Sequence, residues 1–308
     1  MTPEPNLMAG TTTAETAAVE RGGPPHPVLV KIRDLIYKVA GIYQPDDKLC
    51  FIEEKISRRM RARAIRDFSD YFESLTAKPE RDAELRELLN EITDGETCLF
   101  RSLPQMDALR NSILPELTQV KSHMSQRKLR VWCAGCSTGE EAYTLAMVLA
   151  DEIASKYPGW TFELTATDLN ERSLAAAKEG IYGDYALRQT PDHFRDKYFL
   201  AAQGQFQVKP EVKSRVSFSH LNLADERKML FMKGMNLISC CNVLIYFDAN
   251  SRRRAVQHFF SNLLAGGYLL LGEAESLYTF QNEFRLVHFT QATAYFKPSH
   301  SSVPMVKL

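Results

Sequence analysis

The chain of 308 residues lacks the features that mark several large classes of protein. No apolar stretch reaches the roughly 20 residues that a membrane-spanning helix needs, and the N-terminus lacks the basic-then-apolar layout of a secretory signal. Lysine and arginine together number 38, as do aspartate and glutamate, so the surface as a whole has no electrostatic attraction to nucleic acid or to a membrane. We therefore expect a cytoplasmic protein that neither inserts into membranes nor binds nucleic acid.

Cysteine is also scarce, with six residues in a layout that does not suit a disulfide framework. Cys240 and Cys241 are adjacent and others fall in expected buried strands, so we predict free thiols in a reducing compartment. Cys133 and Cys136 form a C-x-x-C pair, which could indicate redox or zinc chemistry. No second pair follows at zinc-finger spacing, and both positions lie where a glycine loop needs small side chains. We therefore favour a structural role and predict no metal site.

The features that are present divide the chain into segments. Residues 1–27 are rich in threonine, alanine, proline and glycine and predict a disordered tail. Helical periodicity throughout 28–92 predicts a small all-helical domain. We interpret 93–127 as a linker with a helix that contributes to the ligand site. Residues 299–308 are interpreted as a C-terminal tail. The helices expected in the first domain cover about 28–40, 46–64, 68–76 and 80–92.

Across 128–298, short apolar strands alternate with helices, which is typical of βαβ units in a parallel sheet. We predict an α/β fold with a Rossmann-like sheet and a closing antiparallel hairpin, preceded by the small all-helical domain. The stretch 181–214 fits neither pattern and is either a small inserted lobe or an ordinary long connection. Strands are expected at 129–134, 161–167, 215–219, 236–241, 267–272 and 285–297, with helices at 138–156, 170–179 and 249–264.

A glycine loop follows the first strand of this sheet. Gly135 and Gly139 allow close backbone approach to a ligand, and the helix that follows places its N-terminal amides there, so the order predicts a nucleotide-type ligand at the carboxyl ends of the strands. Asp168 ends the next strand, and its two carboxylate oxygens suit a ribose diol. The alternative is that Asp168 only caps helix 170–179, a role that Asn170 could fill as well.

Glu140 and Glu141 open the helix after the glycine loop. Acidic residues there stabilise the positive end of the helix dipole, which alone would explain them. Two successive glutamates would also repel a diphosphate and attract an ammonium group, so they favour S-adenosyl-L-methionine over NAD, and an NAD-dependent oxidoreductase becomes the weaker hypothesis.

Asn242 and Tyr246 follow the fourth strand, at the same sheet edge as the glycine loop. The segment lacks the prolines of the Asn/Asp-Pro-Pro-Tyr stretch that amino-directed nucleic-acid methyltransferases carry. The sequence therefore argues against methylation of nucleic-acid bases. Tyr246 could lie near a reacting centre or could pack in the core beside Ile245 and Phe247.

One strongly basic element lies in the helical domain. Within 50–66, six basic residues accompany two acidic ones. Helical spacing places Ile52, Ile56, Met60 and Ala64 inward and Lys55, Arg58, Arg59 and Arg63 outward, where an acidic helix could dock. The alternative is a solvated helix face. Nucleic acid is a weaker candidate because no aromatic residues are interleaved.

Five segments, in this order, resemble the CheR-type chemotaxis receptor methyltransferases. The resemblance covers about 28–297 and implies the methyltransferase version of the Rossmann-like sheet. It also implies that S-adenosyl-L-methionine is used to methyl-esterify glutamates in the cytoplasmic helical bundle of chemoreceptors. The product formed from the cofactor would be S-adenosyl-L-homocysteine. The segments are Gly-Glu-Thr-Cys-Leu-Phe-Arg (95–101), Ala-Gly-Cys-Ser-Thr-Gly-Glu-Glu-Ala-Tyr (134–143), Ala-Thr-Asp-Leu-Asn (166–170), Leu-Asn-Leu (221–223) and Cys-Asn-Val-Leu-Ile-Tyr-Phe-Asp (241–248).

The resemblance also implies roles for individual residues. Arg101 and Tyr246 correspond to positions beside the transferred methyl group and are the candidate catalytic residues. The basic helix corresponds to one that docks on receptor helices, through Lys55, Arg58, Arg59 and Arg63. Cofactor contacts carry over to Gly95, Thr97, Arg101, one or both of Glu140 and Glu141, Asp168, Asn222, Leu223, Cys241 and Asn242.

The chain departs from the family pattern at three positions. Gly95 replaces a usual asparagine, Cys241 replaces an arginine, and Glu273 lies where histidine is common. These changes motivate an alternative, a catalytically impaired cofactor-binding signalling or scaffold protein. Some members of the family also bind a receptor C-terminal peptide through the lobe that matches 181–214. The short loop around Gly204 predicts that this chain does not bind such a peptide. We also expect the protein to be a monomer.

Overall fold

The computed structural model describes residues 26–77, 81–93, 95–120, 127–278 and 283–299. The predicted tails at 1–27 and 299–308 therefore lie almost wholly outside the described residues. In the part that is described, no helix is long and apolar enough to cross a membrane.

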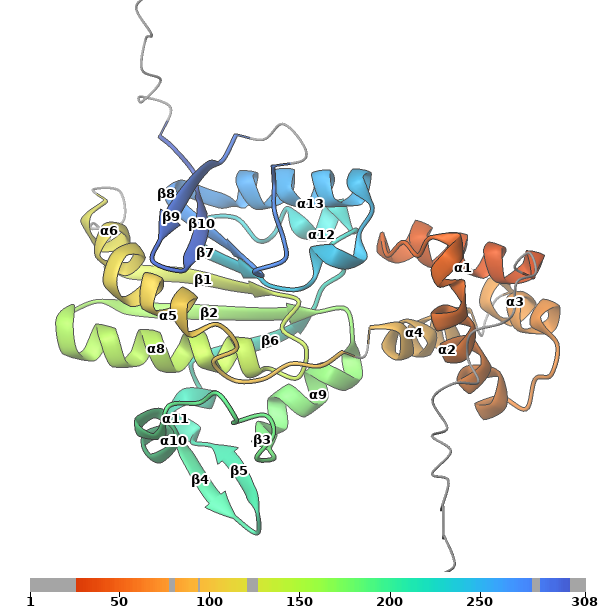
Figure 1. Ribbon diagram of the computed structural model, residues 1–308, viewed down its shortest axis with the longest axis horizontal. Coiled ribbons are helices and arrows are strands. Elements are labelled where there is room, and N and C mark those ends of the chain that lie inside the picture. Colours follow the sequence, from red (N-terminus) through yellow and green to blue (C-terminus); the bar gives the residue numbers. More distant parts are fainter. Residues whose placement is uncertain (1–25, 78–80, 94, 121–126, 279–282, 300–308) are drawn as a thin grey trace, which may run out of the picture.

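Four helices form the first unit of the chain (Figure 1). Pro27 occupies the first turn of α1, and Gly41 ends that helix in a left-handed conformation with φ of 70°. Asp67 caps α3 by accepting hydrogen bonds from the amides of Ser69 and Asp70. The expected inward position of Ala64 is wrong, because the chain has left the helix there with φ of 55° and the residue is exposed. The helices are α1 (Pro27–Ala40), α2 (Leu49–Ala62, after the 3₁₀ turn η1 Asp46–Lys48), α3 (Phe68–Thr76) and α4 (Arg81–Ile92).

A seven-stranded sheet forms the centre of the second unit, in the order β6-β2-β1-β7-β8-β10-β9. The first five of these strands run parallel, and β10 and β9 close the sheet as an antiparallel hairpin. The predicted fold class is confirmed. The strands are β1 (Lys128–Ala134), β2 (Thr161–Asp168), β6 (Val216–His220), β7 (Met235–Cys240), β8 (Leu263–Leu271), β9 (Arg285–Phe289) and β10 (Ala292–Phe296).

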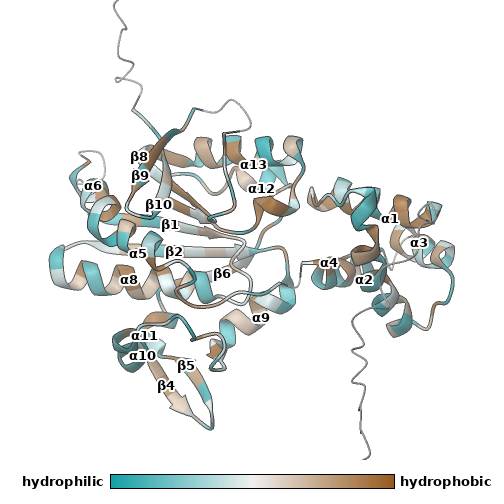
Figure 2. Ribbon diagram, in the orientation of Figure 1, coloured by the Kyte–Doolittle hydropathy of each residue, from teal (hydrophilic) through white to brown (hydrophobic). Residues whose placement is uncertain are grey.

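Helices cover both faces of this sheet, so alternate residues of a strand enter different cores. On β1, Val131 belongs to the core shared with α8, whereas Trp132 belongs to the core shared with α13 and with the N-terminal helices. Figure 2 shows α13 with alternating hydrophobic and hydrophilic bands, as an amphipathic helix has, whereas α8 is buried at every position from Ala142 to Leu149. The covering helices are α8 (Glu140–Lys156), α9 (Glu171–Glu179), α12 (Glu226–Met229) and α13 (Ala249–Asn262). A further helical segment, before the sheet in the chain, consists of α5 (Leu103–Ala108), the π-helical turn η2 (Leu109–Ile113) and α6 (Leu114–Gln119).

The stretch between α9 and β6 forms a small sheet of its own rather than an irregular connection. Its order is β3-β5-β4, with antiparallel pairing. Gln203 and Gly204 make the two-residue turn between β4 and β5, with φ of 52° and 74°, the signs that a tight hairpin requires. The elements are β3 (Ile181–Tyr182), α10 (Asp192–Tyr198), β4 (Phe199–Ala202), β5 (Gln205–Val208) and α11 (Pro210–Lys213).

The N-terminal helices pack at the carboxyl ends of the parallel strands (Figure 1). Ile42 forms an antiparallel bridge with Phe247, and the Asn222 side chain donates a hydrogen bond of 2.7 Å to the carbonyl of Val39. The Tyr37 hydroxyl donates to Asp248 at 3.1 Å. The two units therefore share the space above the sheet edge where the sequence predicts a ligand.

Candidate active site

A cleft of about 660 Å³ opens at the carboxyl ends of β1, β2, β7 and β8. Ala40, Ile42 and Gln44 of the helical unit form one wall, which sequence reasoning missed because nothing in this short connection signals a ligand. The volume is within the range of small-molecule sites. Of the predicted site residues, the cleft is lined by Gly95, Thr97, Arg101, Glu141, Asp168, Asn222, Leu223, Cys241, Asn242 and Tyr246, and not by Glu140.

The glycine loop has the close packing that its sequence predicts. Gly135 has φ of 81°, and a Cβ atom there would lie 2.3 Å from Cγ2 of Val243. The amides of Gly135 and Cys136 both donate to the carbonyl of Thr167, at 2.8 and 3.0 Å, which fixes the loop to the end of β2. Burial raises the pKa of the Cys133 and Cys136 thiols well above the ordinary value, so both are poor nucleophiles.

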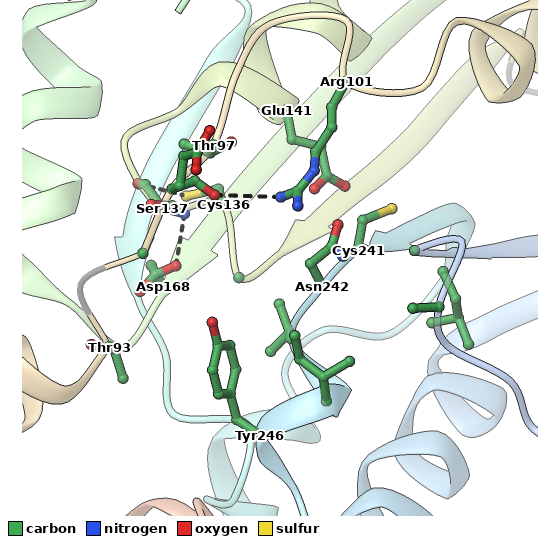
Figure 3. Close-up of a pocket in the computed structure, with 18 of the residues that line it drawn as sticks. Thr93, Thr97, Arg101, Cys136, Ser137, Glu141, Asp168, Cys241, Asn242 and Tyr246 are labelled. Atoms are coloured by element: carbon green, nitrogen blue, oxygen red, sulfur yellow. Dashed lines mark hydrogen bonds between the residues drawn. The ribbon is translucent and has the colours of Figure 1, made fainter. Parts of the chain in front are cut away.

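Asp168 lies at the end of β2 with both carboxylate oxygens oriented by backbone amides. Oδ2 accepts from the Ser137 amide (Figure 3) and Oδ1 from the Asn170 amide, each at 2.7 Å. Burial raises its pKa, and these amide bonds oppose that rise. Asn170 caps α9, since its side chain accepts from the Ser173 amide at 3.0 Å, so the interpretation of Asp168 as the helix cap is wrong. Each oxygen keeps lone pairs for a diol in the cleft.

The two successive glutamates point in different directions. Glu140 is only 4% exposed, and its carboxylate accepts from the Thr138 hydroxyl at 2.7 Å, away from the cleft. Glu141 lines the cleft, accepts from the Ser239 hydroxyl, and has its pKa raised to about 7 by burial. The structure thus places Glu141, and not Glu140, where an ammonium group could bind.

Arg101 and Tyr246 enter the cleft from opposite sides (Figure 3). Arg101 is exposed and donates to the backbone carbonyl of Glu96 at 3.4 Å; among the described residues, no carboxylate forms an ion pair with it. Tyr246 ends the 3₁₀ turn η3 (Leu244–Tyr246) and is 44% exposed, so the alternative of core packing is wrong. A Cβ atom on Gly95 would lie 3.8 Å from the Tyr246 hydroxyl.

Comparison with known proteins identifies the family. Residues 28–93 match the description "CheR methyltransferase, all-alpha domain", and residues 95–293 match "CheR methyltransferase, SAM binding domain". This chain belongs to the CheR methyltransferase family. The predicted resemblance and the predicted cofactor, S-adenosyl-L-methionine, are both confirmed, and the carboxylates of Asp168 and Glu141 fit the ribose and the ammonium group of that compound.

Relatives in this family match nearly the whole chain. The Chemotaxis protein methyltransferase of Borreliella burgdorferi is 35% identical over 81% of this chain and 88% of its own length. Chemotaxis protein methyltransferase 2 of Vibrio cholerae is 30% identical over 87% of this chain and 92% of its own. Chemotaxis protein methyltransferase 1 of Pseudomonas aeruginosa is 30% identical over 85% of this chain and 95% of its own length. The chain is therefore a methyltransferase of the chemotaxis type.

Two of the positions where this CheR chain departs from the family pattern make specific contacts. The Cys241 thiol lies 3.5 Å from Oε1 of Gln105 and 3.6 Å from the Ser239 hydroxyl, and so fills the space beside Glu141. Glu273 accepts from the Ser102 hydroxyl at 3.0 Å. Neither contact obstructs Asp168 at the other end of the cleft.

Glu275 organises the site and was missed by sequence reasoning. Its Oε2 accepts from the amides of Asn242 and Gly272, each at 2.8 Å, and its Oε1 accepts from the amide of Ile245 at 3.1 Å. The carboxylate thereby joins the ends of β7 and β8 to the turn that carries Tyr246. It also supports Asn242, whose φ of 61° is unfavourable for most side chains. A signal was available, namely an acidic residue four positions after β8 ends at Leu271.

The basic helix α2 differs in part from the prediction. Arg59 does not face outward: it pairs with Glu84 of α4 through two hydrogen bonds, at 3.0 and 2.8 Å, and Glu84 is 1% exposed. Tyr71 donates to the same carboxylate at 2.8 Å, and Arg63 approaches it at 3.6 Å. Arg59 borders the apolar stripe of α2, so a buried acidic partner draws it inward. Lys55 is half-buried, and Arg58 is exposed.

Proposed function

We propose that this chain transfers the methyl group of S-adenosyl-L-methionine to glutamate side chains in the cytoplasmic helical bundles of chemoreceptors. The observation that carries the proposal is Arg101, a guanidinium that forms no ion pair with a carboxylate among the described residues, in a cleft that also holds Glu141 and Asp168. An unpaired cation beside a cofactor site suits an anionic acceptor.

The chemistry needs no general base from the protein. S-adenosyl-L-methionine supplies a methyl group bound to a positively charged sulfur. A glutamate side chain, with an ordinary pKa of about 4.3, is already ionised at neutral pH and can attack directly. Arg101 can orient that carboxylate, and the Tyr246 hydroxyl can donate a hydrogen bond beside it. Correct orientation of this kind can lower the barrier by about 7–11 kcal/mol.

The test is methyl transfer to chemoreceptor membranes with radiolabelled cofactor. Base-labile label on the receptor, released as methanol, is expected from a glutamyl methyl ester. Cofactor binding without transfer would instead support the impaired alternative that Gly95, Cys241 and Glu273 motivate. Arg101→Ala is expected to lower transfer while the chain remains folded, and its thermal unfolding supplies that control.

We further propose that α2 docks on the receptor through Lys55 and Arg58, with Arg63 at the edge of this surface and Arg59 holding α2 to α4. Lys55→Glu combined with Arg58→Glu is expected to raise the receptor KM about fivefold or more at low salt, and less at high salt. Arg253→Glu combined with Arg254→Glu, both on the exposed face of α13, is the matched control that also reverses two charges. An unchanged KM would exclude this docking surface.

The tight turn at Gln203 and Gly204 supports the proposal that the small sheet does not capture a receptor C-terminal peptide. Calorimetry with such a peptide is expected to show no binding in the micromolar range. Tight binding would contradict the proposal.

A further inference from the structure

A second groove, of about 610 Å³, lies next to the cleft and shares Arg101, Arg188 and Gln189 with it. Leu103, Pro104 and Pro191 give the groove apolar surface, and none of the described residues that line it is acidic. The groove therefore combines two guanidinium groups with apolar contacts at the entrance to the candidate active site. That combination is complementary to an acidic, partly apolar protein segment.

Arg188 is held in a fixed orientation within this groove. Its guanidinium stacks on the ring of Tyr185 at 3.9 Å, and its Nη1 donates to the Tyr185 carbonyl at 2.7 Å. These contacts immobilise the side chain before any ligand arrives, which reduces the entropy lost on binding. Arg188 therefore resembles a binding group more than a freely moving surface charge.

Glu96 lies where an external carboxylate would bind. Its Oε1 accepts from Nη2 of Arg188 at 2.9 Å and from the Tyr185 hydroxyl at 2.6 Å. The Glu96 side chain is 64% exposed, and that of Arg188 is 33% exposed. Ion pairs at such exposed positions contribute little, so an incoming carboxylate can replace Glu96.

We propose that Arg188 and the Tyr185 hydroxyl bind a carboxylate of the acceptor protein, and that Glu96 occupies this position until the acceptor arrives. The inference rests on the proposed function, because it assumes an acidic acceptor. It makes Arg188 a specificity-determining residue of the small inserted sheet region, distinct from Arg101, which is assigned to the reacting glutamate.

The test is a double-mutant cycle with chemoreceptor membranes as the acceptor. Glu96→Gln is expected to lower the receptor KM about two- to fivefold, because Arg188 loses its internal competitor. Arg188→Gln is expected to raise the KM about two- to fivefold. In the Arg188→Gln background, Glu96→Gln should lower the KM by less than in the unmodified chain, since only the Tyr185 hydroxyl then remains to be released. Arg253→Gln controls for loss of one positive charge.

Two further measurements separate binding from stability and from catalysis. Calorimetry with S-adenosyl-L-homocysteine measures the cofactor affinity of each variant apart from the receptor KM, and Arg188→Lys should recover part of the KM. Co-sedimentation with the same membranes reads acceptor binding without transfer. An unchanged KM and unchanged co-sedimentation for Arg188→Gln would overturn the role of Arg188, whereas absence of transfer by the unmodified chain would overturn the proposed function alone.

Discussion

Glu141→Gln is expected to stabilise the cofactor-free protein at alkaline pH and to weaken cofactor binding. Burial raises the pKa of Glu141 from 4.5 to about 7 in the folded chain, even though the Ser239 hydroxyl donates to it. Between these two pH values the folded state holds a proton that the unfolded chain has lost, so stability falls as pH rises from 4.5 to 7 and is constant above. The difference corresponds to about 3 kcal/mol.

Denaturant unfolding without cofactor, at pH 5 and at pH 8, measures this effect. Replacing the carboxylate by an amide should increase the free energy of unfolding by about 3 kcal/mol at pH 8 and by about 1 kcal/mol or less at pH 5. The amide oxygen of the variant can still accept from Ser239, so the hydrogen bond is not the quantity that changes.

Calorimetry with S-adenosyl-L-homocysteine measures the other half of the prediction. If the ionised Glu141 carboxylate binds the ammonium group, affinity should fall about tenfold for each pH unit below 7 in the unmodified chain. Glu141→Gln should bind more weakly at pH 8 and lose this pH dependence, whereas Glu140→Gln should keep it. Equal stabilisation at pH 5 and pH 8, or an unaltered pH profile of binding, would refute the reasoning.

Three further substitutions follow from the same structure. Arg59→Ala should destabilise the protein by about 3–5 kcal/mol in denaturant unfolding, because it leaves the Glu84 carboxylate buried without its guanidinium, while Arg58→Ala should change stability by about 0.5 kcal/mol or less. Glu275→Gln should cost about 1–3 kcal/mol and lower kcat for methyl transfer, because an amide cannot accept from all three backbone N–H groups; an unchanged kcat would exclude a positioning role. Gly135→Ala should abolish binding of S-adenosyl-L-homocysteine by calorimetry, since the new Cβ meets a neighbouring side chain at φ of 81°.

Local sequence order was sufficient to predict much of the sheet edge. Asp168 ends β2 and the glycine loop follows β1, and parallel strands place their carboxyl ends at one edge of the sheet. Strand identity therefore predicts which residues meet there, without knowledge of the side-chain contacts. Asn242 and Tyr246 follow the same logic, because they come two and six residues after β7 ends at Cys240.

Side-chain direction and long-range pairing could not be predicted in this way. Glu140 and Glu141 point about 100° apart in the first helical turn. The strand pattern did not predict which of them faces the cleft, and their contacts with Thr138 and Ser239 show it. Arg59 is separated by 25 residues from Glu84, so no spacing rule on α2 reveals the pair. Helical periodicity predicts on which face of its helix a residue lies. It does not predict which buried charged side chain of another helix that residue contacts.

The helical unit is part of the cleft and not a separate adaptor for the receptor. Ile42, which bridges to Phe247, lines the cleft, and Asn222 both lines the cleft and holds the end of α1 through the Val39 carbonyl. The apolar residues of α1 to α4 also continue into the core that contains Trp132. Deleting this unit would therefore remove one wall of the cofactor site and expose a core, so loss of methylation by a truncated chain would say nothing about docking. Only exposed substitutions on α2, which leave the contacts of α1 and α4 with the sheet unchanged, can separate receptor binding from cofactor binding.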